Sequence, residues 1–362
     1  MAGARIAWVD YARAYGIVLV VTGHAFRALE RADGLTVDPA LLALVDKVIY
    51  SFHMPFFFLL AGMTKGLSSA RRPSQVGWSL LVTLVWPYLL WSLVLIGLKH
   101  LFTGLSSAEL PTTDLLRVLY LQPVDQFWFL YSLFLIRLAW IAVDAIGNRI
   151  LSRLAVLVPL TLAFVDFGQS SAVLGVWLLF WAAFYGLGTL LTPASLERIR
   201  PSRRLALALV AGVVWVVGLI WSTDLLDDNF GVDRTGIALA GSLMSLLLLS
   251  LLPSSERGFA RLVGLIGEAS LAIYAAQSIG GVLMRVALAK AGLLTPASLV
   301  IGYSLAALLL PTLAYAVLLW LSARWKLPLI SLAGFGMARR SAYFPALSKG
   351  GSAPMAQPRT SS

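Results

Sequence analysis

The dominant pattern in the sequence is a series of long apolar runs separated by short polar or Gly/Pro-rich stretches. A helix needs about 20 such residues to cross a bilayer, and it satisfies its own backbone hydrogen bonds in lipid. The sequence therefore predicts an all-α polytopic membrane bundle of about ten transmembrane helices. The ten runs lie at residues 6–29, 41–63, 77–101, 120–143, 150–166, 173–192, 205–222, 235–252, 262–288 and 298–321.

Composition supports this assignment and divides the chain in two. The chain is 59% hydrophobic and only 12% charged, whereas average soluble proteins carry about 25% charged residues. Residues 1–323 form the expected integral-membrane domain. Residues 324–362 are rich in Ser, Gly, Pro and basic residues, which predicts a flexible basic cytoplasmic tail in contact with anionic membrane lipid. The chain has no cysteine, which excludes disulfides, zinc thiolates and cysteine nucleophiles.

The distribution of Lys and Arg predicts the orientation of the chain. Alternate loops hold 18 of these residues, whereas the opposite set holds 7. Because Lys and Arg favour cytoplasmic loops, both termini are expected in the cytoplasm. The net charge of +11 is then a signal of topology, and nucleic acid is not expected as a partner. We expect a multi-pass protein of the bacterial inner membrane.

The first run carries three ionisable residues, Asp10, Arg13 and His24. Eleven residues at 100° each make about three turns plus 20°, so Arg13 and His24 share one helix face, roughly 16 Å apart. Asp10 precedes Arg13 by three residues and can pair with it. Ionisable groups inside a membrane usually face a bundle interior or a wet cavity. The pattern favours a helix that lines a reaction chamber, and the alternative is a signal anchor with a polar end.

Two histidines are candidates for the chemistry. His24 is suited to act as a general base because imidazole exchanges a proton near neutral pH; the alternative is a buried, hydrogen-bonded histidine. His53 lies in SFHMPFFFLLAGM, where Pro55 must leave backbone carbonyls without partners. It can be a packing histidine at a kink or a residue that contacts substrate. The histidines lack metal-ligand spacing and have no clustered carboxylates, so no metal site is expected.

Three further places could bind a substrate. Lys65, Arg71 and Arg72 form a basic loop that could hold the phosphates of a cytosolic donor, although positive-inside charge also explains it. Trp128 lies in FWFLYSLFLIRL, which can be an aromatic belt or a stacking surface for a sugar-like acceptor. Glu268, in GLIGEASLAIYAAQ, is expected at a helix start, where it would cap the helix or contact the reaction chamber.

The sequence resembles the acyltransferase 3 family of integral-membrane acyltransferases. The likeness rests on WVDYARAYGIVLVVTGH, with ten residues between Arg13 and His24, and on SFHMPFFFLLAGM. VWPYLLW, FWFLYSLF and IGEASLAIYAAQ add support in the family's order, and the FHMP form is similar to sugar O-acetylases of polysaccharide and nodulation-factor type. Two departures are Gln277, where many members have histidine, and the uncharged stretch 79–86, where members often have basic residues.

The resemblance implies a function as well as a fold. An acyl group, commonly acetyl, would pass from cytosolic acyl-CoA as co-substrate to a hydroxyl of a glycan or lipid-linked sugar, without a permanently bound cofactor. His24 would be the essential histidine, Arg13 its partner in the motif, and Asp10 would hold Arg13. His24 could act as a base or as a nucleophile that forms an acyl-imidazole. The alternative function is a transporter or flippase for a small organic acid or a lipid-linked sugar, which the lack of internal repeats disfavours.

Overall fold

A computed structural model describes residues 6–32, 34–65, 73–101, 123–165, 174–222, 231–253 and 258–336. Every regular element in these ranges is helical, which confirms the all-α prediction. The helices are α1 (Ala7–Glu30), α2 (Pro39–Tyr50), α3 (His53–Met63), α4 (Pro73–Leu80), η2 (Leu81–Val85), α5 (Trp86–Leu101), η4 (Asp125–Phe127), α7 (Trp128–Ile146), α8 (Arg149–Ala163), α9 (Leu174–Leu190), α10 (Pro193–Glu197), α11 (Pro201–Trp221), α12 (Val232–Leu249), α13 (Gly258–Glu268), α14 (Ser270–Lys290), α15 (Pro296–Trp325) and α16 (Leu329–Leu332).

Seven helical segments of the described chain are long and apolar enough to cross a membrane. They are Pro39–Met63, Gln75–Leu98, Asp125–Ile146, Pro201–Trp221, Val232–Leu249, Ser270–Lys290 and Pro296–Trp325. The other three predicted runs are also helical, as α1, α8 and α9. Of these, α1 has the length but is more polar, whereas α8 has 15 residues and α9 has 17. The polytopic bundle is therefore present.

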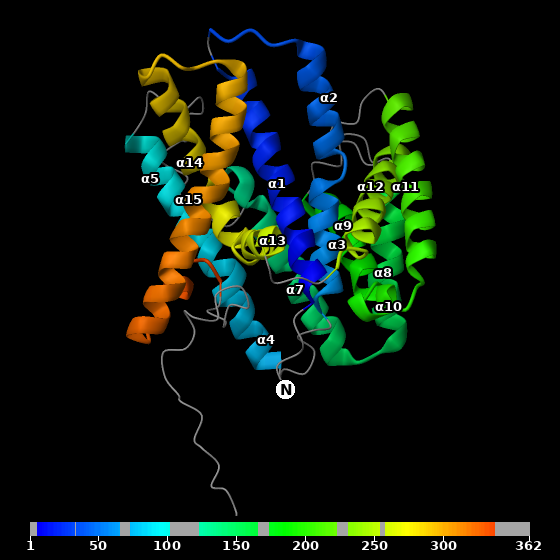
Figure 1. The fold of residues 1–362 in the computed structure, drawn as a ribbon. Coiled ribbons are helices and arrows are strands. Elements are labelled where there is room, and N and C mark those ends of the chain that lie inside the picture. The colour runs from blue at the N-terminus through cyan, green and yellow to red at the C-terminus, as the bar shows by residue number, and fades with distance from the viewer. Residues whose placement is uncertain are drawn as a thin grey trace, which may run out of the picture.

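Helix α1 lies at the centre of this bundle. It packs against α2, α3, α12, α13, α14 and α15, so it has neighbours from both halves of the chain. In Figure 1, α13, α14 and α15 lie on one side of α1, and α8, α9, α11 and α12 lie on the other. The start of α1 and the end of α15 lie at the same, lower end of the bundle (Figure 1). The predicted tail lies outside the described residues from position 337 onward.

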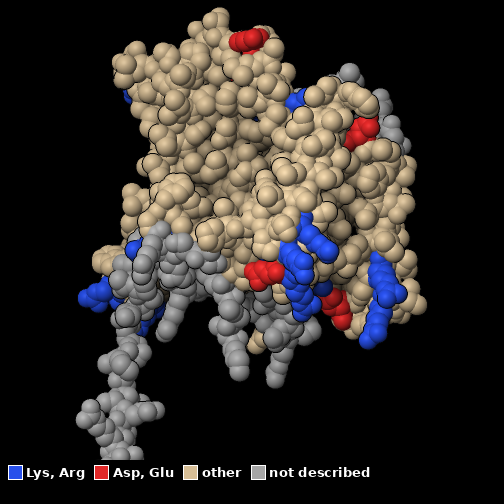
Figure 2. Space-filling model, turned by 45° about the vertical axis from the view of Figure 1, so that its right-hand side comes forward, with Lys and Arg blue, Asp and Glu red and all other residues tan. Residues whose placement is uncertain are grey.

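The outer surface of the bundle matches a lipid environment. Helix α11 is the clearest case: Val213 is 63% exposed and Ile220 is 73% exposed, and both are apolar. Figure 2 shows Lys and Arg gathered mostly at the lower end of the molecule, below a broad band with few charged side chains. An exposed apolar band of this kind is expected where acyl chains replace water, because lipid does not penalise apolar side chains.

Glycines bring three helices unusually close to their neighbours. A Cβ added to Gly62 of α3 would lie 2.0 Å from the carbonyl oxygen of Tyr185, and one added to Gly188 of α9 would lie 2.0 Å from that of Leu59. At Gly267 of α13 it would lie 1.9 Å from the carbonyl oxygen of Asp10. Small residues permit such close packing in membrane bundles. The contact of Gly267 with Asp10 fixes the start of α1, which carries the predicted site residues Asp10 and Arg13.

Several predicted runs contain more than one helix. The run at 41–63 divides into α2 and α3, and the run at 77–101 divides into α4, the π-helical turn η2 and α5. The run at 262–288 divides into α13 and α14 at Ala269. A proline explains the first break, because Pro55 has no N–H to donate to the carbonyl of Ser51. The break places His53 at the first position of α3, inside the bundle.

Candidate active site

The charged residues at the start of α1 form an ion pair. Arg13 Nη1 lies 3.3 Å from Asp10 Oδ1, as the three-residue spacing predicts. The Asp10 side chain is 4% exposed, whereas that of Arg13 is 38% exposed. The pair therefore has a buried carboxylate and a half-buried cation. Gly267 lies directly against the Asp10 backbone, so α13 holds this end of α1.

Replacing Arg13 by alanine is expected to reduce both stability and activity. The change removes the Arg13 guanidinium from the buried Asp10 carboxylate, and loss of this contact costs about 1–3 kcal/mol after allowing for the partial exposure of Arg13. Thermal unfolding of the detergent-solubilised variant measures the loss. The double variant Arg13→Ala/Asp10→Asn should recover part of the lost stability, because the buried negative charge of Asp10 is then removed together with Arg13. If the double variant is less stable than Arg13→Ala, the ion pair does not explain the loss.

His24 lies near the other end of α1, roughly 16 Å from Arg13 along the axis. Its side chain is half-buried, in a bundle whose interior is otherwise mostly apolar. The charges of Arg27, Arg31 and Asp125 act on its ring, so all three lie nearby. His53 also lies close enough to interact electrostatically with His24. Gly23, the neighbour of His24, packs against the Tyr50 ring, and that ring packs edge-on against His53, so Tyr50 links the two histidine positions. Arg13 lies about three helical turns from His24 along α1.

His53 fills the break between α2 and α3. Its ring is 4% exposed, and Nδ1 lies 2.8 Å from the carbonyl oxygen of Ile49. Since a carbonyl only accepts, Nδ1 must carry the proton, and Nε2 of the neutral ring then has the free lone pair. His53 thus adds a side-chain donor to the Ile49 carbonyl at the end of α2, which also accepts from the backbone N–H of Phe52. It keeps one ring nitrogen available for a substrate hydroxyl or for a proton.

A clamp on the same side fixes the position of the two histidines. The Arg27 guanidinium donates from Nε and Nη2 to the two carboxylate oxygens of Asp46, both at 3.1 Å. It also lies 3.6 Å from the centroid of the Tyr50 ring, which packs edge-on against His53 at 4.7 Å. A bidentate Arg–carboxylate pair holds a planar geometry. The clamp joins α1 to α2 one turn after His24.

η4, α14 and α15 contribute a second group of polar contacts, which the sequence analysis did not predict. Gln126 Nε2 donates to Ser278 Oγ at 3.2 Å, and the Tyr274 hydroxyl donates to the carbonyl oxygen of Gln126. Tyr303 of α15 lies near Ser278 and acts electrostatically on Tyr50. The two hydrogen bonds join η4 to α14, and α1 packs against both α14 and α15. The available signal was the polar pair at 125–126 immediately before the aromatic run.

Asp125, the neighbour of Gln126, has an unusual backbone. Its φ is +43°, in the left-handed region, and its side chain is exposed. Such a conformation costs about 1 kcal/mol or more in a residue other than glycine and is concentrated at functional sites. The strain falls at the residue whose carboxylate acts on His24.

Trp128 is part of an aromatic cluster between α3, α7 and α9. Its ring centroid lies 4.9 Å from that of Trp181, 5.3 Å from Trp177 and 6.3 Å from Phe58. Trp181 is buried, and its Nε1 has no hydrogen-bond partner among the described residues. Trp128 is itself half-buried. The rings mostly pack against each other, so a sugar-stacking role would involve only the accessible part of Trp128.

The remaining predicted residues do not join the histidine cluster. Lys65 Nζ lies 2.7 Å from Asp144 Oδ1 at the lower end of the bundle, and Arg71 and Arg72 lie outside the described residues. Glu268 ends α13 instead of opening a helix, so the predicted cap is wrong: α14 starts at Ser270 and has no side-chain cap. The Glu268 carboxylate accepts a 3.1 Å hydrogen bond from Tyr315.

Gln277 of α14 is fully buried, and its amide has no partner in the described chain. Neither its nitrogen nor its oxygen makes a hydrogen bond there. An unsatisfied buried amide costs about 1–3 kcal/mol, so this position is suited to bind a polar group of a ligand or a water. Within the described ranges, no three His, Asp or Glu side chains lie close enough together to hold a metal ion.

A half-buried histidine thus lies on the central helix of a membrane bundle, and a second histidine lies on the neighbouring helix α3. A family model described as an acyltransferase domain matches residues 6–316. The chain belongs to the acyltransferase 3 family. The match starts one residue before α1 and ends within α15, so it contains the whole histidine cluster of this acyltransferase. The resemblance in the motifs is therefore confirmed. No curated protein and no solved structure matches the chain.

Proposed function

We propose that this membrane acyltransferase moves an acyl group, acetyl in the commonest case, from cytosolic acyl-CoA to a hydroxyl of a cell-surface or exported glycan. The observation that carries the proposal is that Tyr50 packs against both Gly23, next to His24, and the His53 ring, so both histidines belong to one part of an otherwise mostly apolar bundle. Transfer to a hydroxyl requires removal of a proton, and histidine is the side chain best suited to take it near neutral pH. A multi-pass enzyme can receive its two substrates from opposite sides of the inner membrane.

The reaction needs one base and one positioning surface. The acceptor oxygen attacks the thioester carbonyl, a C–O bond forms and the C–S bond breaks. His24 takes the hydroxyl proton and returns it to the CoA thiolate. His53, with its Nδ1 bound to Ile49, is positioned to contact the acceptor through Nε2. In the second route His24 itself attacks, and an acyl-imidazole carries the group to the acceptor while CoA stays in the cytoplasm.

The charged residues distant from His24 have supporting roles in the proposal. Arg13, held by Asp10, and the basic segment of Lys65, Arg71 and Arg72 would contact the donor from the cytoplasmic side. Trp128 and Glu268 remain candidate substrate contacts, the former through its half-buried ring. Membrane lipid covers the apolar band. The acceptor would be a glycan or a lipid-linked sugar that reaches the His24 end of α1.

Inverted membrane vesicles that contain the protein test the proposal. They receive acetyl-CoA labelled in the acetyl group, and the glycans are then analysed for alkali-labile label. We expect label on glycan with the wild-type protein and only background in vesicles that lack it. Counterflow of a small acid or a lipid-linked sugar without covalent label would instead favour the transporter, and would refute acyl transfer to a glycan.

A further inference from the structure

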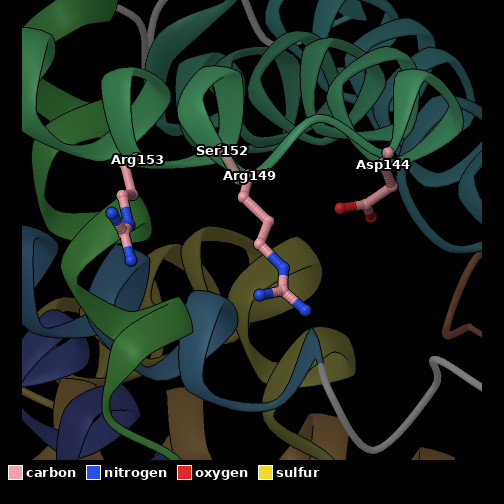
Figure 3. Close-up of a pocket in the computed structure, with 5 residues that line it drawn as sticks. Asp144, Arg149, Ser152 and Arg153 are labelled. Carbon is pink, nitrogen blue, oxygen red and sulfur yellow. The ribbon is translucent and has the colours of Figure 1, made fainter.

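A second candidate site lies at the turn between α7 and α8, at the lower end of the bundle. The turn surrounds a hollow of about 370 Å³, lined by Asp144, Gly147, Arg149, Ser152 and Arg153. This volume falls within the range of about 300–1,000 Å³ that is typical of small-molecule sites. Figure 3 shows the Arg149 and Arg153 side chains leaving α8 toward the same side. The hollow is open to solvent, so a ligand can enter without any rearrangement of the bundle.

Local sequence explains the shape of the hollow. Gly147 ends α7 with φ +67°, a conformation that glycine adopts at no steric cost. Asn148 then caps α8 and accepts from the backbone N–H groups of Ile150 and Leu151. Because these N–H groups are already bound, recognition at this turn falls to side chains. Arg149 and Arg153 are four residues apart and therefore neighbours on one helix face.

The charges of the hollow favour an anion. Neither Arg149 nor Arg153 makes an ion pair with a carboxylate of the described chain, and both side chains are exposed. The one acidic side chain of the lining, Asp144, is bound by Lys65 at 2.7 Å. Arginine is well suited to phosphate because its planar fork binds two oxygens at once. Two such forks at the edge of one hollow match a ligand with more than one phosphate.

We propose that this hollow binds the phosphate groups of the nucleotide part of the acyl-CoA donor, an inference that rests on the proposed function. Position supports it. The Lys65 ammonium contacts Asp144 in the lining of the hollow, and Lys65 lies twelve residues after His53, which corresponds to roughly 18 Å along a helix. The acyl thioester of CoA lies at the end of a long flexible arm. Phosphates held at the hollow would therefore let the thioester enter the bundle toward the histidines.

Binding of CoA to the purified full-length protein in zwitterionic nanodiscs tests the assignment by titration calorimetry. The variant Arg149→Gln/Arg153→Gln is expected to weaken CoA binding about 100-fold, roughly tenfold for each lost charge-assisted contact. Adenosine 3′,5′-bisphosphate should compete with CoA in the wild-type protein. The matched control is Arg200→Gln/Arg203→Gln, which removes two exposed arginines at the start of α11 with the same change in charge. It should change CoA affinity less than twofold.

Each outcome gives a decision. Equal CoA affinity in wild type and Arg149→Gln/Arg153→Gln overturns the inference alone. If the variant leaves CoA affinity unchanged but retains less phosphatidylglycerol when purified from a mixed-lipid bilayer, the inference is also overturned and the hollow is a lipid-phosphate site. A wild-type protein that does not bind CoA overturns the donor of the proposed function together with this site. Intact CoA binding without glycan acylation refutes only the acceptor.

Discussion

His24→Ala is expected to abolish acyl transfer, with a loss of at least about 10²–10⁴-fold, while the protein still folds and inserts. Both proposed routes need the imidazole, as base or nucleophile. Its side chain is half-buried and makes no hydrogen bond to another residue of the described ranges. The packing loss should therefore be small, about 1 kcal/mol. Rate of transfer per mole of folded protein in vesicles is the measurement.

Chemical rescue separates catalysis from packing in this experiment. Alanine at position 24 leaves a space into which added imidazole can diffuse, and a missing base can then be supplied from solution. Imidazole should raise the rate of His24→Ala and leave that of Arg13→Ala unchanged, because Arg13 lies roughly 16 Å away. Wild-type activity in His24→Ala protein of normal abundance would contradict the catalytic assignment.

His24 could be found from sequence because its signal is local. A charged or titratable residue in an apolar run of this length is expensive unless it faces the interior, and α1 proved to be the central helix of the bundle. The helical period also gave the spacing of Arg13 and His24 along one helix. It could not give the contacts of either residue. Those depend on α3, η4 and α13, which are distant in the chain.

The polar contacts between η4 and α14 are the part that sequence reasoning missed. Ser278 and Tyr274 are ordinary residues of an apolar helix, and nothing in the period of α14 marks them. They become significant only because Ser278 accepts from Gln126 and the Tyr274 hydroxyl donates to the Gln126 carbonyl. The misplacement of Glu268 has a similar cause. Glu268 was expected at a helix start, but α13 ends at Glu268 and α14 begins at Ser270, and no proline marks this break in the sequence.

Gly267→Ala is expected to be the most destabilising single-methyl change in the part of α13 that packs on α1. The added Cβ would lie 1.9 Å from the carbonyl oxygen of Asp10 and 2.7 Å from its carbonyl carbon. Both are backbone atoms, so no side chain can rotate away and the two helices must separate. Overpacking of this kind costs about 1–3 kcal/mol or more. Acyl transfer should fall as well, because the start of α1 carries Arg13.

Gly236→Ala of α12 is the matched control, because it makes the same chemical change inside a helix where a Cβ would meet nothing within 4 Å. Alanine is the better helix former, so this variant should be as stable as wild type or more stable by up to about 1 kcal/mol. Thermal unfolding in one detergent compares the two variants. The two variants are expected to change stability in opposite directions, whereas a general intolerance of glycine substitutions would destabilise both variants. If Gly267→Ala unfolds at the wild-type temperature, the close approach of α13 to α1 does not exist in the folded protein, and the position assigned to the Asp10–Arg13 pair must be revised.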